Sequence, residues 1–147
     1  GYQVNMTRES NDVNMSWAER ARLAEKSGAG ALIHIHAHSQ ESTSVTGVLA
    51  SCQSSRNSYN GDLASESYAL SSCIAGSVSQ AAGAKNRGVK QTDTSSEINW
   101  SQVPVTSLET GFLSNQQEEL LLSQEEYQSR IAVGIADGLD QFFAGRR

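Results

Sequence analysis

The sequence contains few of the residues that cross-link or bend a chain. Among its 147 residues there are one proline and two cysteines. Cys52 and Cys73 do not stand in a CxxC or a Cys/His spacing, which argues against a structural zinc site built on thiolates. The two residues are compatible with one disulfide in an oxidising compartment or with two buried thiols, and we favour free thiols. A chain of this length buries roughly two-thirds of its unfolded surface, so its core needs no covalent staple.

Excess positive charge and long apolar runs are also missing. The formal net charge is -5, and the nearest approach to a basic cluster is Lys85, Arg87 and Lys90. No face of the kind that binds nucleic acid therefore stands out. No apolar run approaches the ~20 residues that cross a bilayer. No signal peptide is visible, but the chain begins at Gly1 without Met, so we expect a processed, tagged or trimmed product in which a lost signal would leave no trace.

The apolar residues that are present follow two periods. Short alternating or continuous apolar segments predict strands at 2–7, 31–38, 45–52 and 103–108. A spacing of three to four residues predicts helices at 17–26, 61–82 and around the stripe Tyr127, Ile131, Ile135, Leu139 and Phe142. Residues 83–97 are predicted to be a polar connection. Strands that alternate with helices indicate an α/β fold, with a mostly parallel twisted sheet flanked by helices.

The three histidines of the chain fall within five residues, in the segment Ala-Leu-Ile-His-Ile-His-Ala-His at 31–38. Side chains alternate across a strand, so His34, His36 and His38 are expected on one face. An isolated histidine is most often structural or merely exposed. Three histidines at alternate positions favour metal binding.

Glu109 directly follows the predicted strand at 103–108. In open α/β sheets, ligands bind beyond the carboxyl ends of the strands, where this strand and the histidine strand would share an edge. A histidine ligand beside a carboxylate is the arrangement of a zinc hydrolase. A lone glutamate after a strand is more often a solvated surface residue, so position alone does not assign Glu109 a role.

A longer motif surrounds this glutamate. The stretch 108–115 reads Leu-Glu-Thr-Gly-Phe-Leu-Ser-Asn and is followed by Glu118 and Glu119. It closely resembles the Val-Glu-Xaa-Gly-Phe-Leu-Ser-Asn signature of the zinc-dependent N-acetylmuramoyl-L-alanine amidases of the type 3 family. The segment His-Ile-His-Ala-His at 34–38 resembles that family's Ser-Ile-His-Ala-Asn motif. The resemblance extends over about residues 2–143.

The resemblance implies a catalytic glutamate at Glu109 and a zinc ligand at His36. It implies hydrolysis of the amide that joins N-acetylmuramic acid to L-alanine in peptidoglycan, with Zn²⁺ as cofactor, by a secreted or cell-wall enzyme of bacterial or phage origin. His34 and His38 stand where the family usually has Ser and Asn. We favour neutral substitutions there over surrogate metal ligands.

The chain also departs from the family pattern. Family members begin with a strand and a Gly-His-Gly-Gly-like loop that supplies the first zinc histidine, and a helix-associated glutamate supplies another ligand. This chain starts at what resembles the second strand, so residues 1–147 are expected to form a single amidase-like domain with an N-terminally truncated sheet. A missing N-terminal segment would then have to complete the site. Two alternatives stay open: a non-catalytic, amidase-derived module that binds peptidoglycan, and an unrelated α/β protein that binds a metal through the histidine cluster.

Overall fold

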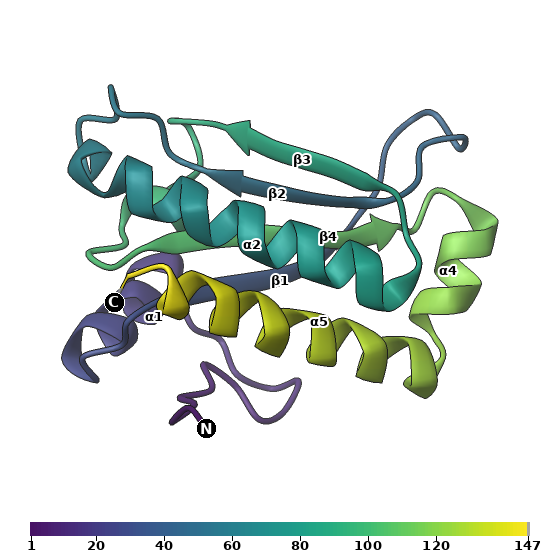
Figure 1. Cartoon of the computed structure of the whole chain (residues 1–147), viewed down its shortest axis with the longest axis horizontal. Coiled ribbons are helices and arrows are strands. Elements are labelled where there is room, and N and C mark those ends of the chain that lie inside the picture. The colour runs from purple at the N-terminus through teal and green to yellow at the C-terminus, as the bar shows by residue number, and fades with distance from the viewer. Residues whose placement is uncertain (147) are drawn as a thin grey trace.

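The computed structural model describes residues 1–146, in which the strands form one twisted sheet (Figure 1). The sheet order is β1-β4-β2-β3. The strands are β1 (Leu32–His38), β2 (Val48–Cys52), β3 (Asn86–Gln91) and β4 (Val105–Phe112). β1 therefore lies at one edge of the described sheet and β4 lies inside it.

The sheet is mixed rather than uniformly parallel. β1 pairs with β4 in parallel and β2 pairs with β3 in parallel, but β2 and β4 run antiparallel. The predicted α/β fold with a mostly parallel sheet is confirmed, with this one reversal added. The reversal follows from the connection at 39–47, which contains no helix and is too short for the crossover that a parallel return requires.

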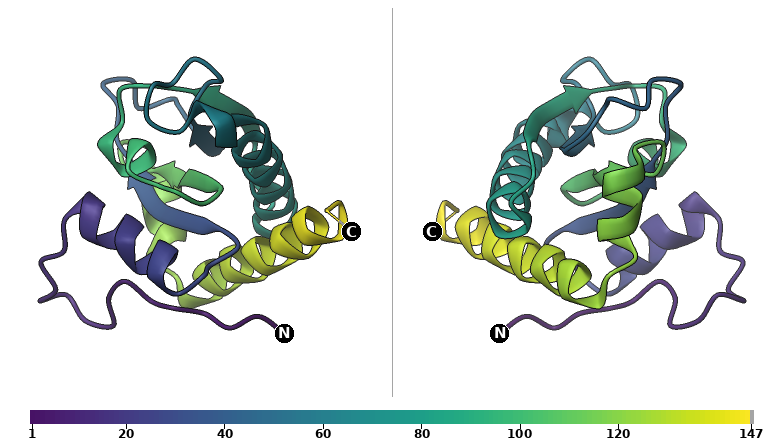
Figure 2. Two further views of the ribbon diagram at one scale, coloured as in Figure 1. Left: turned by 90° about the vertical axis from the view of Figure 1, so that its left-hand side faces the viewer. Right: turned by 90° about the vertical axis from the view of Figure 1, so that its right-hand side faces the viewer.

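Helices cover the sheet unequally. They are α1 (Trp17–Lys26), the 3₁₀ turn η1 (Gly61–Leu63), α2 (Ala64–Ala82), α3 (Ser96–Asn99), α4 (Gln116–Leu122) and α5 (Glu125–Ala144). α2 and α5 lie on one face, and α1 lies on the other (Figure 2). None of the helices in residues 1–146 is long and apolar enough to cross a membrane.

The main core fills the space between the sheet and the pair α2–α5. Leu70, Ile74 and Val78 of α2 meet Leu108 of β4 there, and all four side chains are fully buried. The two helices approach closely because α5 carries glycine at the contact. A Cβ at Gly138 would lie 2.8 Å from the Cα of Ile74, a distance that real Cβ atoms do not reach.

The opposite face has a much smaller core. Ala24 of α1, Ile98 of α3 and the strand residues Leu32 and Val105 form a second buried cluster at the beginning of β1 and β4. Beyond this cluster, that face carries the partly exposed side chains of His36, His38 and Glu109.

Local sequence signals explain where the helices begin. Ser16 and Glu19 form a capping box at the start of α1. The side chain of Asn115 accepts hydrogen bonds from the amides of Gln117 and Glu118 at the start of α4. Glu118 is itself buried, and its two carboxylate oxygens accept the amides of Gly47 and Phe112 at 2.7 Å each.

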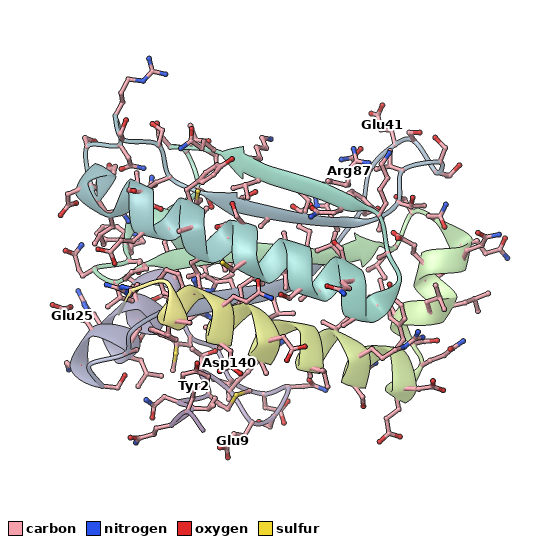
Figure 3. The ribbon with its side chains drawn as sticks, in the orientation of Figure 1. Tyr2, Glu9, Glu25, Glu41, Arg87 and Asp140 are labelled. Atoms are coloured by element: carbon pink, nitrogen blue, oxygen red, sulfur yellow. The ribbon has the colours of Figure 1, made fainter. Side chains whose placement is uncertain are left out.

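The predicted strand at 2–7 is wrong. These residues are irregular, and Val4 and Met6 are 71% and 63% exposed. Their alternation resembles a strand, but no strand of the described chain lies alongside to pair with them. The segment is anchored near both ends: the hydroxyl of Tyr2 donates a hydrogen bond of 2.6 Å to Asp140 of α5 (Figure 3), and Thr7 accepts one of 3.1 Å from Arg20 of α1.

Two further predictions need correction. The connection predicted at 83–97 contains strand β3 and the start of helix α3. The sequence gives no sign of the strand, because β3 is a polar edge strand without apolar alternation. The strand predicted at 103–108 continues to Phe112, so Glu109 lies within it. The favoured free thiols are confirmed: Cys52 is buried, Cys73 is half-buried, and neither is bonded.

Candidate active site on the open face of the sheet

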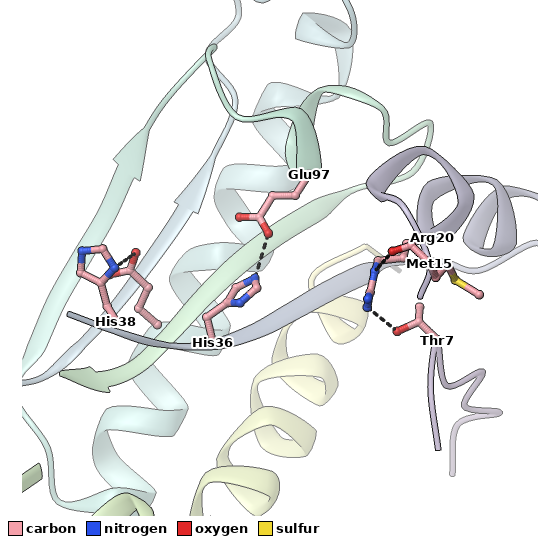
Figure 4. A network of polar contacts seen from close by, with 7 residues as sticks. Thr7, Met15, Arg20, His36, His38 and Glu97 are labelled. Atoms are coloured by element: carbon pink, nitrogen blue, oxygen red, sulfur yellow. Dashed lines mark hydrogen bonds and ion pairs between the residues drawn. The ribbon is translucent and has the colours of Figure 1, made fainter. Parts of the chain in front are cut away.

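The pleat of β1 directs its histidines to the open face, where Figure 4 shows His36 and His38. The rings of His34 and His36 are stacked, with centroids 6.4 Å apart. Trp17 of α1 forms the wall behind them, with its ring edge-on at 5.3 Å from His34 and 5.9 Å from His36. The predicted common face for these side chains is confirmed.

Glu109 lies beside these histidines. The parallel register pairs His36 with Glu109 on the adjacent strand, so the two side chains stand on the same face. One carboxylate oxygen of Glu109, Oε1, lies 3.5 Å from Nδ1 of His38. The other, Oε2, is buried without a hydrogen-bond partner among residues 1–146. The residues singled out from the sequence do lie close together, but Glu109 and His36 meet within their strands and not, as the sequence had predicted, beyond the strand ends.

The nearest partner of His36 is a residue that the sequence did not single out. Oε2 of Glu97 lies 2.8 Å from Nε2 of His36 (Figure 4). Glu97 belongs to the four-residue helix α3, within a segment predicted to be a polar connection. No periodicity or motif marks it, because its position depends on how α3 packs across the beginning of β1 and β4.

The His36–Glu97 pair has opposed effects on the two groups. The hydrogen bond to Glu97 raises the pKa of His36 above its usual value, against the opposite effect of burial. Burial is the largest influence on Glu97 and favours its neutral form, but hydrogen bonds with His36 and with Ser107 bring its pKa below the usual range. Both shifts favour a charged pair.

His34 has the opposite character. It is 5% exposed, and burial lowers the pKa of its imidazole. Its Nε2 is buried without a hydrogen-bond partner in the described part of the chain. A neutral ring that packs against Trp17 accounts for these observations and requires no metal.

The comparisons with known proteins add to this geometry. A family model described as N-acetylmuramoyl-L-alanine amidase matches residues 1–141, nearly the whole chain. The chain belongs to this amidase family. The family predicted from the sequence is thereby confirmed, and the alternative of an unrelated histidine-cluster protein is wrong.

Two curated proteins of Bacillus subtilis (strain 168) are relatives of this amidase-family chain. The uncharacterized protein YqiI is 30% identical over 135 residues, which are 91% of this chain and 61% of that protein. The N-acetylmuramoyl-L-alanine amidase LytC is also 30% identical over 135 residues, which cover 26% of its length. The chain thus spans less than two-thirds of either relative.

Solved structures share the fold. The catalytic domain of the amidase CwlV from Bacillus (Paenibacillus) polymyxa var. colistinus matches with a TM-score of 0.78 and 29% identity, over 92% of this chain and 70% of that one. An N-acetylmuramoyl-L-alanine amidase from Clostridium difficile 630 matches with a TM-score of 0.85 over 99% of this chain and 74% of that one, and at 24% identity it supports the fold alone.

The donors on the open face suit zinc in kind but not in number. Imidazole and carboxylate are zinc ligands, and the unpartnered oxygen of Glu109 adds a free donor. Catalytic zinc normally takes three protein ligands. No group of three or more His, Cys, Asp or Glu side chains within residues 1–146 of the amidase chain is arranged to hold a metal. The three histidines of β1 accordingly do not form a metal site by themselves.

Proposed function

We propose that this chain is part of a zinc-dependent hydrolase that cleaves the amide between N-acetylmuramic acid and L-alanine in peptidoglycan. The observation that carries the proposal is the placement of His36 opposite Glu109 on the uncovered face of a sheet that belongs to the amidase family. Imidazole and carboxylate side by side are the groups that such a hydrolysis needs. Residues 1–147 would form one amidase-like domain, and its substrate implies a secreted or cell-wall location.

His36 is proposed to supply one zinc ligand. Zinc, when bound, polarises the scissile carbonyl and acidifies a water molecule. The imidazole is 37% exposed, so a ligand can reach it from the open face. It must be neutral to bind a metal, so affinity should fall as pH drops below the pKa of His36.

Glu109 is proposed as the catalytic residue. Its Oε2 is buried and has no hydrogen-bond partner within residues 1–146, so this oxygen keeps its capacity to accept a proton from a water molecule admitted to the site and to return it to the leaving amine. Its Oε1 faces Nδ1 of His38, which would hold the carboxylate in place. His38 thereby has an orienting role that does not require it to bind metal.

The remaining zinc ligands are proposed to come from a further segment, on the same or another chain. The described residues contain no set of three donors, and the outer edge of β1 has no partner strand among them. An apolar groove of about 530 Å³ lies between this edge and the helices α4 and α5. Its lining includes Ile35, Leu122, Ile131 and Ile135. An added strand on β1 and an apolar side chain in the groove would complete the sheet and bring donors toward His36.

The test is digestion of purified cell walls in the presence of zinc. We expect release of stem peptides with a free L-alanine amino group, detected by mass spectrometry and by labelling of new amino termini. Cleavage at any other bond would contradict the proposed reaction. Peptidoglycan that is neither cleaved nor bound would also contradict it.

A second candidate is a non-catalytic peptidoglycan-binding module. The shortage of metal donors in residues 1–146 favours it. It predicts that the chain sediments with cell walls while no amide bond is cut, whether or not zinc is added. Cleavage by the chain would eliminate this candidate.

A further inference from the structure

Glu97 contacts both inner histidines of β1 from a helix that the sequence gives no reason to notice. Its Oε2 lies 2.8 Å from Nε2 of His36, and its backbone forms a hydrogen bond with the ring of His34. The Glu97 side chain is 15% exposed, against 37% for that of His36. The contact is therefore partly buried, with the carboxylate on its more enclosed side.

The helix that carries Glu97 is itself fixed. Ile98 is fully buried in the small core against β1 and β4. The amide of Asn60 donates hydrogen bonds to the carbonyl oxygens of Ile98 and Ser101, at 2.9 and 3.0 Å. α3 is thus held at the residue that follows Glu97 and again just beyond the end of the helix.

The carboxylate is also held at its other end. Ser107, which faces His34 across the β1–β4 register, forms a side-chain hydrogen bond with Glu97. Trp17 stands edge-on against the His36 ring and limits its rotation from the side of α1. In the orientation that the structure shows, Nε2 of the imidazole meets the carboxylate.

A carboxylate that accepts a hydrogen bond from one ring nitrogen determines the tautomer of a neutral imidazole. The proton stays on Nε2, and the lone pair is then on Nδ1. No contact within residues 1–146 gives the Nδ1 of His36 a hydrogen-bond partner. This nitrogen is the one left available to a ligand.

We propose that Glu97 is a positioning residue, which fixes the orientation and tautomer of His36 so that Nδ1 is presented to a divalent cation. The cation's identity as zinc rests on the proposed function, but the tautomer does not. Glu97 would act through His36 and would not touch the substrate.

The direct test is a long-range ¹H–¹⁵N NMR correlation of the histidine rings, recorded at one mildly alkaline pH where the rings are neutral. In the wild-type chain we expect His36 to carry its proton on Nε2. Glu97→Ala should shift His36 to a mixture of tautomers. Glu25→Ala, at an exposed position of α1, is the matched control and should leave the His36 signals unchanged. An unchanged His36 tautomer in Glu97→Ala would overturn the proposal.

A second variant covers the case in which Glu97→Ala does not fold. Ser107→Ala keeps the carboxylate but removes one of its two side-chain hydrogen bonds. It should broaden or split the His36 ring signals, while the signals of His38 stay as in the wild type. Sharp and unshifted His36 signals in a folded Ser107→Ala chain would count against positioning by Glu97.

Metal affinity supplies the second readout. Titration with Zn²⁺ against a chromophoric chelator should show a dissociation constant raised by about tenfold or more in Glu97→Ala, which is the usual effect of losing the partner of a histidine ligand. Glu97→Asp should restore part of the affinity, and Glu25→Ala should match the wild type. Equal affinities for wild type and Glu97→Ala would contradict the proposal. A wild-type chain that binds no zinc would overturn the presentation of His36 to a cation by these residues alone, and the NMR result would still decide whether Glu97 sets the tautomer of His36.

Discussion

The two faces of this sheet differ in how completely helices cover them. The face toward α2 and α5 is dry, closely packed and complete within the described chain, with glycines where the helices meet. The other face has a small core at one end and leaves Glu109 and His36 partly open. Because side chains alternate along a strand, each strand places its core residues on one face and its candidate site residues on the other. Neighbouring residues of β4 can therefore be changed one at a time to affect one property and not the other.

The largest expected effect is on turnover and comes from the open face. In an active, zinc-loaded preparation, Glu109→Gln should reduce amidase turnover by about 10²–10⁴-fold, because a general acid–base group contributes that much. The unfolding free energy should not fall, since Oε2 of Glu109 has no hydrogen bond to lose within the described residues. Cell-wall digestion and chemical denaturation measure the two quantities.

Glu41→Gln, in the exposed loop after β1, is the control for this loss of a carboxylate and should keep full activity. Wild-type turnover in Glu109→Gln would remove Glu109 from the mechanism. A large drop in stability would show that the two faces are not separable at this position.

The preceding residue should behave in the opposite way. Leu108 is fully buried against α2, and Leu108→Ala should lower the unfolding free energy by about 2–5 kcal/mol, as expected for a truncated core leucine. Urea denaturation measures this loss. Below its new melting temperature the variant should retain the His36 tautomer of the wild type. A stable Leu108→Ala chain with a disturbed histidine site would reverse the assignment of the faces.

The helix contact gives a smaller effect. Gly138→Ala places a Cβ against the backbone of Ile74 and should cost about 1–3 kcal/mol through overpacking. Gly76→Ala is the matched control, since nothing lies within 4 Å of a Cβ at that helical position. Thermal unfolding of the two variants should separate them. Equal melting temperatures would mean that α2 and α5 can move apart without cost.

The smallest effect separates two histidines of one strand. The pKa of His36 is raised above the usual value of 6.5, mainly by its hydrogen bond to Glu97, while burial lowers the pKa of His34. The stability contributed by His36 is present below the unfolded pKa and is lost as pH rises through its folded pKa. For His34 the sign is opposite: its neutral form favours the fold above the unfolded pKa, and this contribution is lost as pH falls through the folded pKa.

An NMR titration of the ring protons should therefore show His36 gaining its proton at higher pH than His34. In Glu97→Gln the midpoint of His36 should move down toward that of His34. Coincident midpoints in the wild type would indicate that the two rings share one environment.

Much of the closed face could be predicted from the sequence. The stripe with Leu70, Ile74 and Val78 has a helical period, and hydrophobic burial acts on such patterns wherever they occur. The same reasoning failed at residues 2–7, where an alternating pattern found no neighbouring strand. It failed again at β3, whose polar residues are tolerated at the edge of a sheet.

The open face was predicted in its histidines and in Glu109, because their spacing and the surrounding motif are local signals. The role of Glu97 was not, because a four-residue helix has no period and its position depends on the burial of Ile98 and on the hydrogen bonds of Asn60. The antiparallel pairing of β2 and β4 was missed for a related reason: the order of strands is a property of the assembled sheet. Local sequence patterns do not specify which distant segments come into contact, and both of these features depend on such contacts.

The buried carboxylate of Glu118 has a consequence for register. Its two oxygens accept the amides of Gly47, just before β2, and of Phe112, at the end of β4. One side chain thus clamps two antiparallel neighbours at the same end. If β4 slipped by a single position, all its side chains would exchange faces. Glu109 would then enter the apolar core between the sheet and α2–α5, while Leu108 would face the open side. By opposing that slip, Glu118 keeps Glu109 on the open face beside His36.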